Sequence, residues 1–395
     1  MVVGHPFFLA YNQQKYVAMK RINRDLRLRL VVPKRGCDRF DVTDYQVHPE
    51  LALDEVVPLK AYMTKSHMTY MHAPTALSAA LREFQPDVIY MEEEPHAFIT
   101  VAMIGLRNLY APQAAVAAFS WDNILRPRRF PAGAAKEGLR AYSLRQISLM
   151  VCGNREAAGL LRAEGKLNGS IEILPQYGLD VDEHQPGTEP HLRDQLGLQG
   201  VPVIGYLGRM VPEKGLRLLF EALAGIEKYP WKLLLVGSGP LDQEIREQWM
   251  TRLSGRIVCV NAVPYEQVTR YFRCADIFVL ASQSRPTWKE QFGLSLAQAM
   301  MLGIPCIGSS SGAIRDVVGP GGLIFDENQF SDLRRHLEAL LNSPELRARF
   351  GEQGRRFALE HYTRNGVAAK YLAAFDRARR PSSSLASASE EAVAS

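Results

Sequence analysis

The sequence predicts an α/β fold in which two doubly wound parallel sheets form two domains. The chain has 395 residues, which is more than one ordinary hydrophobic core accommodates. Short, continuous apolar runs alternate with amphipathic stretches, as expected for strands that are buried on both faces and separated by helices. A polar stretch over residues 178–200, with Pro186, Gly187, Pro190 and Gly200, interrupts this alternation and indicates an interdomain linker.

The apolar runs give the expected strands and domain limits. In the first half the runs are 2–3, 28–32, 88–91, 116–119, 149–152 and 171–174. In the second half they are 203–206, 233–236, 258–260, 277–280, 304–307 and 323–325. We therefore expect a first domain over 1–177 and a second over 178–366. A helix over 367–377 follows, and then a tail over 378–395 that is rich in Ser and Ala and predicted to be disordered.

Composition and charge indicate which classes of protein and partner are compatible with the sequence. A hydrophobic fraction of 47% and a charged fraction of 23% are typical of a soluble globular protein. The net charge of +5, without a dense basic stripe interleaved with aromatics, argues against a nucleic-acid partner. Basic residues gather in two groups, which indicate a solvated surface or else a face for an anionic membrane or a phosphorylated acceptor. The groups are Lys20, Arg21, Arg24, Arg27, Arg29, Lys34 and Arg35, and Arg126, Arg128, Arg129, Lys136, Arg140 and Arg145.

The five cysteines are scattered and form no C-x-x-C pair, which favours a reducing compartment over a disulfide scaffold or a zinc site. The first residues lack the features of a signal peptide, and no apolar run is long enough to span a bilayer. We expect a cytoplasmic protein, with peripheral contact to the inner membrane face as a further expectation. Asp180 and Asp182 spell D-x-D, but they lie in the linker, so we expect no metal there.

The first motif with chemical meaning is the segment 208–215, GRMVPEKG, between an expected strand and an expected helix. Gly208 allows close approach of backbone to a ligand, and the helix start offers free N–H groups to an anion. Arg209 adds a bidentate guanidinium and Lys214 a point charge, both suited to phosphate oxygens. An ordinary turn with surface cations is the alternative interpretation.

The second motif is the segment 290–300, EQFGLSLAQAM, followed by Gly303. A helix is expected to start near Gly293 and stop at Gly303, with a first turn that could hold a phosphate. Glu290 precedes this helix, and Gln298 lies about two turns along it, so both could contact sugar hydroxyls. The alternative is a normally capped helix with Glu290 favourable at the helix dipole.

The two motifs, together with 236–240 (VGSGP), resemble the retaining glycosyltransferases of family 4. Segments 287–293 and 311–313, Glu94-Pro95 and 121–123 also match members that build bacterial polysaccharides, and the resemblance covers nearly the whole chain before the tail. It implies a GT-B fold, in which two Rossmann-like domains face each other across a cleft. The first domain would bind the acceptor and the second the nucleotide-sugar, and the last helix would cross back to the first domain.

The resemblance also implies roles for single residues. Arg209, Lys214 and Glu290 would be catalytic, since they would hold the donor diphosphate and contact the donor sugar. The remaining donor-binding positions would be Gly208, Gly237, Gly293, Leu294, Ser295 and Gln298.

Acceptor binding is expected from residues that follow strands of the first half. Glu92, Glu93 and Glu94 follow one strand, and alternation along it allows at most Glu92 and Glu94 to converge. We expect Glu94 to lie in a pocket and the other two acids to be solvated. Asp122 or Glu94 could orient the acceptor hydroxyl, and Trp121 is expected either to stack on a sugar ring or to pack. The expected acceptor-binding positions are Asn12, Gln13, Gln14, Glu94, Trp121, Asp122 and Asn123.

Three positions depart from the family pattern. Gln298 stands where the family has a second acid, which removes a charge from the ribose contact. Ser120 stands where many members have a His after the fifth strand, and 12–14 (NQQ) replaces a glycine-rich loop. We carry no catalytic His over to His5 or His96.

The function expected is transfer of a hexose-like sugar from a nucleoside diphosphate sugar to a sugar or lipid-linked acceptor. The anomeric configuration would be retained, no metal or other cofactor would be needed, and the product would belong to a polysaccharide or glycoconjugate. Two alternatives stay open: a non-catalytic partner subunit that keeps the fold, which Gln298 and Ser120 favour, and a nucleotide-sugar epimerase.

Overall fold

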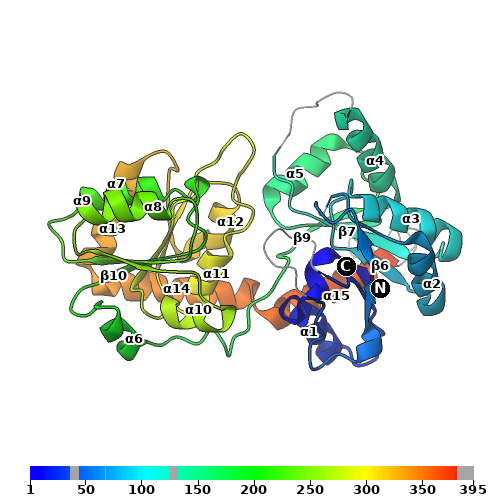
Figure 1. Ribbon diagram of the computed structural model, residues 1–395, viewed down its shortest axis with the longest axis horizontal. Helices are drawn as coiled ribbons and strands as arrows, with labels where there is room; N and C mark the ends of the chain where they lie inside the picture. Colours follow the sequence, from blue (N-terminus) through cyan, green and yellow to red (C-terminus); the bar gives the residue numbers. More distant parts are fainter. Residues whose placement is uncertain (36–43, 67, 125–131, 380–395) are drawn as a thin grey trace, which may run out of the picture. The chain divides into compact units, whose positions relative to one another are not determined.

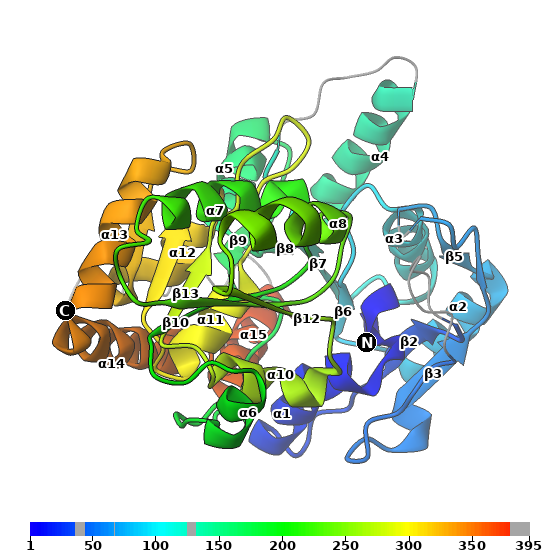
Figure 2. The same ribbon diagram turned by 60° about the vertical axis from the view of Figure 1, so that its left-hand side comes forward.

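The computed structural model describes residues 1–35, 44–66, 68–124 and 132–379. The chain divides into two compact units, which we call unit 1 (residues 1–178 and 364–395) and unit 2 (residues 179–363). Each unit is built on its own parallel sheet with helices on its faces (Figures 1 and 2). Within the described residues, no helix combines the length and the apolar character needed to cross a bilayer.

Unit 1 contains a seven-stranded parallel sheet in the order β3-β2-β1-β6-β7-β8-β9. Its strands are β1 Val2–Val3, β2 Leu30–Pro33, β3 Val56–Leu59, β6 Val88–Met91, β7 Ala115–Ser120, β8 Leu149–Cys152 and β9 Ser170–Ile173. A separate antiparallel pair joins β4 Ala61–Tyr62 to β5 Met71–His72. The helices are α1 Gln14–Ile22, α2 Pro74–Phe84, α3 Phe98–Tyr110, α4 Ala132–Gln146, α5 Arg155–Glu164 and α15 Arg364–Arg379.

Two cores lie on opposite faces of the sheet of unit 1. One core is formed by α2, α3 and α5, with Leu81 and Met103 fully buried against the strands. The other is formed by α1 and α15, which pack on each other and bury Tyr16 and Tyr371. The sequence places α15 at the far end of the chain, so unit 1 is completed only by residues that follow unit 2.

Unit 2 contains a six-stranded parallel sheet in the order β12-β11-β10-β13-β14-β15, in which the chain starts at the centre and reverses direction once, as in dinucleotide-binding folds. Its strands are β10 Val203–Leu207, β11 Lys232–Val236, β12 Ile257–Val260, β13 Ile277–Leu280, β14 Cys306–Ser309 and β15 Leu323–Phe325. Its helices are α6 Pro190–Gln195, α7 Leu216–Ala224, α8 Asp242–Glu244, α9 Met250–Arg252, α10 Tyr265–Phe272, α11 Leu294–Met301, α12 Ile314–Val318, α13 Phe330–Asn342 and α14 Pro344–His361. Helices α7 and α13 pack together on one face, and α11 and α14 pack together on the other (Figure 2).

The twelve expected strands all form, but some of the sequence-based expectations were wrong. Strand β3 was missed, because Pro58 within a short apolar run argues against a strand; β3 is an edge strand, where a missing N–H is tolerated. Burial on both faces fails for β9 and for most of β12, which are also edge strands.

The expected linker over 178–200 is not a free connection. Its residues from Leu179 onward pack on unit 2, where they form α6 and bury Leu192 and His184. Leu179 N–H donates to the carbonyl of Tyr362 at 2.7 Å, so the two points where the chain passes between the units lie side by side. The last helix is longer than expected at both ends, since α15 begins at Arg364 and includes residues 378 and 379. The rest of the predicted tail lies outside the described residues.

Candidate functional site

The carboxyl end of the sheet in unit 2 holds an ion pair between two of the predicted catalytic residues. Lys214 Nζ donates to Glu290 Oε2 at 2.6 Å, and the hydroxyl of Ser282 donates to the same oxygen at 2.7 Å. Glu290 is buried, with 6% of its surface exposed, whereas Lys214 is half-buried. The structure therefore brings these two residues together, although they are 76 positions apart.

Local backbone geometry explains why they meet. Lys214 ends a 3-10 turn over Pro212–Lys214, and Gly215 follows in the left-handed region with φ of +68°. A Cβ built on Gly215 would lie 1.7 Å from the carbonyl oxygen of Ala281, so only glycine lets the turn after β10 pack against the end of β13. The N–H of Gln283 then donates to the carbonyl of Glu213 at 2.8 Å and fixes this contact.

Two further residues shape the surroundings of Lys214. Trp288 lies in a tight turn in which Arg285 and Trp288 exchange backbone hydrogen bonds, and its ring centroid is 5.1 Å from Lys214 Nζ. At this distance the indole attracts the ammonium group. Ser282 was not predicted. It lies two residues after the expected strand 277–280, at the sheet edge where Glu290 was already expected. This position could have identified Ser282 as a residue of the site.

The other donor-site predictions lie around the same sheet edge. Arg209 is exposed, and among the residues that the structure describes its side chain has neither an ion pair nor a hydrogen bond, so its guanidinium can accept a ligand. Gly208 and Gly237 directly follow the neighbouring strands β10 and β11. Gly237 has φ of +144°, and a Cβ on it would lie 2.0 Å from the carbonyl oxygen of Gly208, so these two turns are in direct backbone contact.

The helix after Glu290 begins as expected. Gly293 is the N-cap of α11, Leu294 and Ser295 are its first residues, and their side chains are exposed and half-buried, respectively. The backbone of Glu290 accepts the N–H of Ala313 at 3.0 Å, which fixes the segment before the helix. Gln298 is buried, and its amide donates to the hydroxyl of Tyr265 at 3.4 Å, so in this structure the amide links α11 to α10.

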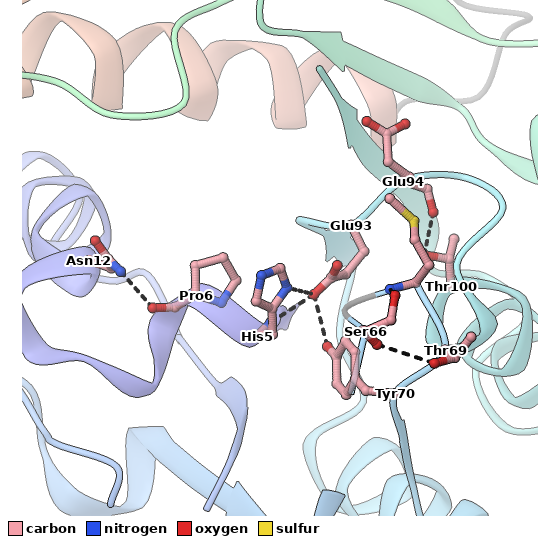
Figure 3. Close-up of polar contacts among 10 residues, drawn as sticks. His5, Pro6, Asn12, Ser66, Thr69, Tyr70, Glu93, Glu94 and Thr100 are labelled. Atoms are coloured by element: carbon pink, nitrogen blue, oxygen red, sulfur yellow. Dashed lines mark hydrogen bonds and ion pairs between the residues drawn. The ribbon is translucent and has the colours of Figure 1, made fainter. Parts of the chain in front are cut away.

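In unit 1 the register of the sheet brings polar residues from three strand ends together. Val3 lies opposite Met91, and two residues further along each strand His5 meets Glu93. Met91 lies opposite Ala118, and three residues further along Glu94 meets Trp121, whose N–H donates to Glu94 Oε1 at 2.9 Å. Figure 3 shows that the carboxylates of Glu93 and Glu94 point in different directions, the first toward His5 and Tyr70.

Glu94 is held by neutral groups. The hydroxyl of Ser120 donates to Glu94 Oε2 at 2.7 Å, in addition to the N–H of Trp121. Burial, with a smaller contribution from the charge of Asp122, raises the pKa of Glu94 from 4.5 to about 7. Such a carboxyl group can both donate and accept a proton near neutral pH.

The remaining acceptor-site predictions are placed as follows. The indole N–H of Trp121 donates to Gln176 at 3.0 Å, and the ring packs edge-on against Phe119. The N–H of Asp122 donates to Ser120 Oγ at 3.3 Å. Asn123 is buried and donates to Glu156 at 3.1 Å.

The side chains of residues 12–14 form hydrogen bonds with other residues of unit 1. Asn12 donates to the carbonyl of Pro6 at 2.7 Å, as drawn in Figure 3. Gln13 is fully buried and uses its amide on the backbone of Phe7, Gln46 and His48. Gln14 accepts a hydrogen bond from Arg364 of α15. These contacts give the three amides a role in holding unit 1 together.

The expectation that Glu92 and Glu93 are solvated was wrong. Glu92 is buried and pairs with Lys15, both of its oxygens lying 2.9 Å from Lys15 Nζ, and Tyr16 donates to it as well. Glu93 is buried and accepts from His5 and Tyr70. Alternation along β6 gave no indication of these partners, because they come from the segment that follows β1.

The other polar features have local explanations. Asp180 caps a turn by accepting the N–H of Asp182 at 2.7 Å and that of Glu183 at 3.3 Å. Of the two basic groups, Arg21 pairs with Glu50 and Arg140 pairs with Glu164, whereas Arg126, Arg128 and Arg129 lie outside the described residues.

Comparison with known proteins supports a glycosyltransferase relationship for unit 2. Residues 189–357 match the family described as glycosyl transferases group 1. The chain is 26% identical over 225 residues to the GDP-mannose-dependent alpha-(1-6)-phosphatidylinositol monomannoside mannosyltransferase of Mycolicibacterium smegmatis, covering 54% of this chain and 59% of that protein. It is 27% identical over 254 residues to the 2-deoxystreptamine glucosyltransferase of Streptomyces kanamyceticus, covering 60% of this chain and 62% of that protein. The chain thus spans about three fifths of the length of these two relatives.

Solved structures extend the likeness to the whole fold. The sucrose-phosphate synthase of Thermosynechococcus elongatus superposes with a TM-score of 0.71 at 18% identity, covering 95% of this chain and 98% of the other. The HepE protein of Anabaena, solved in complex with UDP, superposes with a TM-score of 0.71 at 16% identity, covering 95% and 99%. The chain therefore has the GT-B fold of glycosyltransferases, with two Rossmann-like units.

Proposed function

We propose that this chain is a hexosyltransferase that moves a sugar from a nucleoside diphosphate sugar to an acceptor hydroxyl with retention of the anomeric configuration. Unit 2 would bind the donor and unit 1 the acceptor, in the cytoplasm or at the inner membrane face, and the product would be a polysaccharide or glycoconjugate. The observation that carries the proposal is the pairing of Lys214 with Glu290 at the carboxyl end of the sheet in unit 2, the edge at which the exposed Arg209 follows β10. Ligands of open α/β sheets bind at this edge.

The chemistry follows from charge. Departure of a diphosphate leaves negative charge on its oxygens while positive charge develops at the anomeric carbon. Arg209 offers a bidentate guanidinium, and Lys214 can exchange one carboxylate partner for phosphate. We propose that these protein cations stabilise the leaving group without a metal ion. Glu290 is fixed by Ser282 and would then contact the donor sugar.

The chemistry named in the relatives suggests the substrates to test. Two relatives are described as acting on phosphatidylinositol monomannoside or 2-deoxystreptamine, both built on a hydroxylated six-membered carbocycle. Their names include a GDP-mannose-dependent enzyme and a glucosyltransferase. A first panel should therefore combine GDP-mannose and UDP-glucose with myo-inositol and 2-deoxystreptamine.

The experiment has two stages. Thermal unfolding with a panel of nucleoside diphosphates tests binding, because a ligand that binds the folded state raises the melting temperature. Incubation with labelled donors then tests turnover. Release of nucleoside diphosphate with formation of a glycoside is the expected result, and product stereochemistry by NMR tests retention. Binding without turnover would instead indicate a non-catalytic partner subunit, and an isomerised donor would indicate an epimerase.

A further inference from the structure

Tyr362 lies where the chain is about to leave unit 2, and it is connected to the segment that carries Glu290. It is the C-cap of α14, and its carbonyl accepts the N–H of Leu179, the first residue of unit 2, at 2.7 Å. Tyr362 is buried, with 7% of its surface exposed. Its hydroxyl and its ring each contact a further element of unit 2.

The first connection runs through α12. The hydroxyl of Tyr362 donates to the carbonyl of Val317, in the last turn of this helix, at 3.0 Å. At the other end of α12, the N–H of its N-cap residue Ala313 donates to the carbonyl of Glu290 at 3.0 Å. The preceding Gly312 has φ of +52°, and a Cβ on it would lie 2.1 Å from that carbonyl oxygen. The short helix thus holds the backbone of Glu290 at one end and the side chain of Tyr362 at the other.

The second connection is aromatic. The ring of Phe292, two residues after Glu290, packs edge-on against the ring of Tyr362, with centroids 5.5 Å apart and an interplanar angle of 89°. Such pairs favour this orientation, because the positive edge of one ring meets the negative face of the other. Phe292 directly precedes Gly293, the N-cap of α11. Tyr362 is therefore connected to the segment 290–293 both by α12 and by its ring.

We propose that Tyr362 is a positioning residue for Glu290, acting through α12 and Phe292. This inference rests on the proposed function, in which Glu290 contacts the donor sugar. Lys214 and Ser282 hold the carboxylate of Glu290, whereas Tyr362 holds the backbone from which that side chain projects. Tyr362 should therefore favour binding of the donor sugar more than binding of the diphosphate.

The proposal has a consequence for the point where the chain crosses between the units. Coupling between two sites is reciprocal, so a sugar held by Glu290 must stabilise the contacts of Tyr362 as much as Tyr362 stabilises the sugar. One of these contacts is the hydrogen bond from Leu179 to the carbonyl of Tyr362. A bound donor sugar is therefore expected to protect this hydrogen bond from opening, and a nucleoside diphosphate alone is not.

The test measures, by isothermal titration, the affinities of UDP-glucose and UDP and those of GDP-mannose and GDP. The members of each pair share the nucleoside diphosphate and differ in the sugar. Tyr362→Phe keeps the ring and removes the hydroxyl. We expect it to bind the nucleotide-sugar about tenfold more weakly than wild type and the nucleoside diphosphate within about twofold.

Trp231→Phe is the matched control. It also removes a buried hydrogen bond from a side chain to a carbonyl, in this case from the indole N–H to Ile226 at 3.0 Å. Trp231 directly precedes β11 and so lies at the amino end of the sheet, opposite to Glu290. This variant should keep the wild-type affinity for both members of each pair.

Two more variants and one exchange measurement test the connection itself. Glu290→Ala should weaken the nucleotide-sugar, and adding Tyr362→Phe should then cost less than about twofold more, because the side chain that Tyr362 positions is absent. Phe292→Leu breaks the second connection and should weaken the nucleotide-sugar about fivefold, also if Tyr362→Phe fails to fold. In the wild-type chain, the amide of Leu179 should exchange about fivefold more slowly with UDP-glucose than with UDP.

The outcomes separate this inference from the proposed function. A wild-type chain that binds no nucleotide-sugar of the panel would refute the proposed function and the role of Tyr362 with it. A wild-type chain that binds one, together with a Tyr362→Phe variant of equal affinity, would overturn the role of Tyr362 alone. Equal losses for the nucleotide-sugar and the nucleoside diphosphate would also overturn it, since they would show a general structural role. So would losses from Tyr362→Phe and Glu290→Ala that simply multiply in the double variant.

Discussion

Both units contain a lysine–glutamate pair beside aromatic rings, but the two pairs differ in burial. In unit 1, Lys15 and Glu92 have side-chain exposures of 1% and 0%, and Lys15 Nζ lies 4.3 Å from the ring centroid of Tyr371. In unit 2, Lys214 and Glu290 have exposures of 16% and 8%, and the single ring facing the lysine in the described structure is that of Trp288. An ammonium group, a carboxylate and aromatic rings thus form a cluster that is buried from solvent in unit 1 and partly exposed to solvent in unit 2.

The difference determines what each pair can do. Lys15 lies within 6.0 Å of the ring centroids of Phe7, Tyr16, Tyr90, Tyr177 and Tyr371. Burial lowers the pKa of Lys15 below 10.5, while the charge of Glu92 opposes this shift. A ligand cannot reach such a pair, whereas solvent reaches part of the Lys214 side chain, as its proposed contact with a phosphate requires. An ion pair is therefore evidence for a binding site only where solvent reaches it.

The largest expected effect is on stability, in unit 1. Glu92→Leu removes the only carboxylate that the described structure pairs with Lys15 and leaves a buried charge, so we expect the free energy of unfolding to fall by about 3–5 kcal/mol. Urea unfolding measures this. The double variant Lys15→Met/Glu92→Leu should recover most of the loss, since apolar groups of similar volume can replace a buried pair. A single variant as stable as wild type would contradict the interpretation of this cluster.

The next effect is on activity, in unit 2. Lys214→Ala should lower turnover about 100-fold to 1000-fold, because it removes a positive charge from the leaving diphosphate. Its melting temperature should fall less than that of Glu92→Leu, since Ser282 still donates to Glu290 and the pair is less deeply buried. Steady-state kinetics and thermal unfolding of the same preparation check both statements. Unchanged turnover would refute the role of Lys214, and Arg217→Ala, which breaks an exposed pair with Glu244, is the control.

Glu94 can be compared with Glu92 and Glu290, which each pair with a lysine. Its carboxyl group instead accepts hydrogen bonds from a hydroxyl and an N–H. Its pKa in the folded state is about 7, above the ordinary 4.5 that applies when the chain is unfolded. The folded state therefore binds more protons between pH 4.5 and 7, and stability should decrease as the pH rises through this window. Glu94→Gln should reduce this decrease by about 3 kcal/mol in urea unfolding at several pH values. An unchanged pH dependence would contradict the raised pKa.

The smallest expected effect concerns Trp288. A cation–π contact at a partly exposed site contributes about 1 kcal/mol, so Trp288→Leu should weaken nucleoside diphosphate binding about fivefold through misplacement of Lys214. Trp288→Phe keeps an aromatic face and should bind more nearly as wild type does. Isothermal titration measures both affinities. Equal affinities in the leucine and phenylalanine variants would show that the ring acts only by its volume.

Most of the fold could be predicted from the sequence, because buried parallel strands leave continuous apolar runs and the turns between them leave glycines. The pair of Lys214 with Glu290 was also within reach, since both follow strands at one sheet edge. The contacts of His5 and Lys15 could not be predicted, because they depend on β1 lying beside β6. The order of strands in a sheet does not follow from local sequence patterns. Strand β3 was missed for another reason, namely that an edge strand tolerates Pro58.

The insertion of unit 2 within unit 1 has a consequence for synthesis on the ribosome. Residues 179–363 are continuous, and their ends are joined by the hydrogen bond from Leu179 to Tyr362, so this part can fold as soon as it has emerged. Tyr371, by contrast, completes the rings around Lys15 and is translated only after unit 2. During elongation, residues 1–178 are expected to lack the apolar cover that α15 provides, so that Tyr16 and Tyr90 stay exposed while unit 2 folds. The part of the protein made second is thus expected to be the part that is finished first.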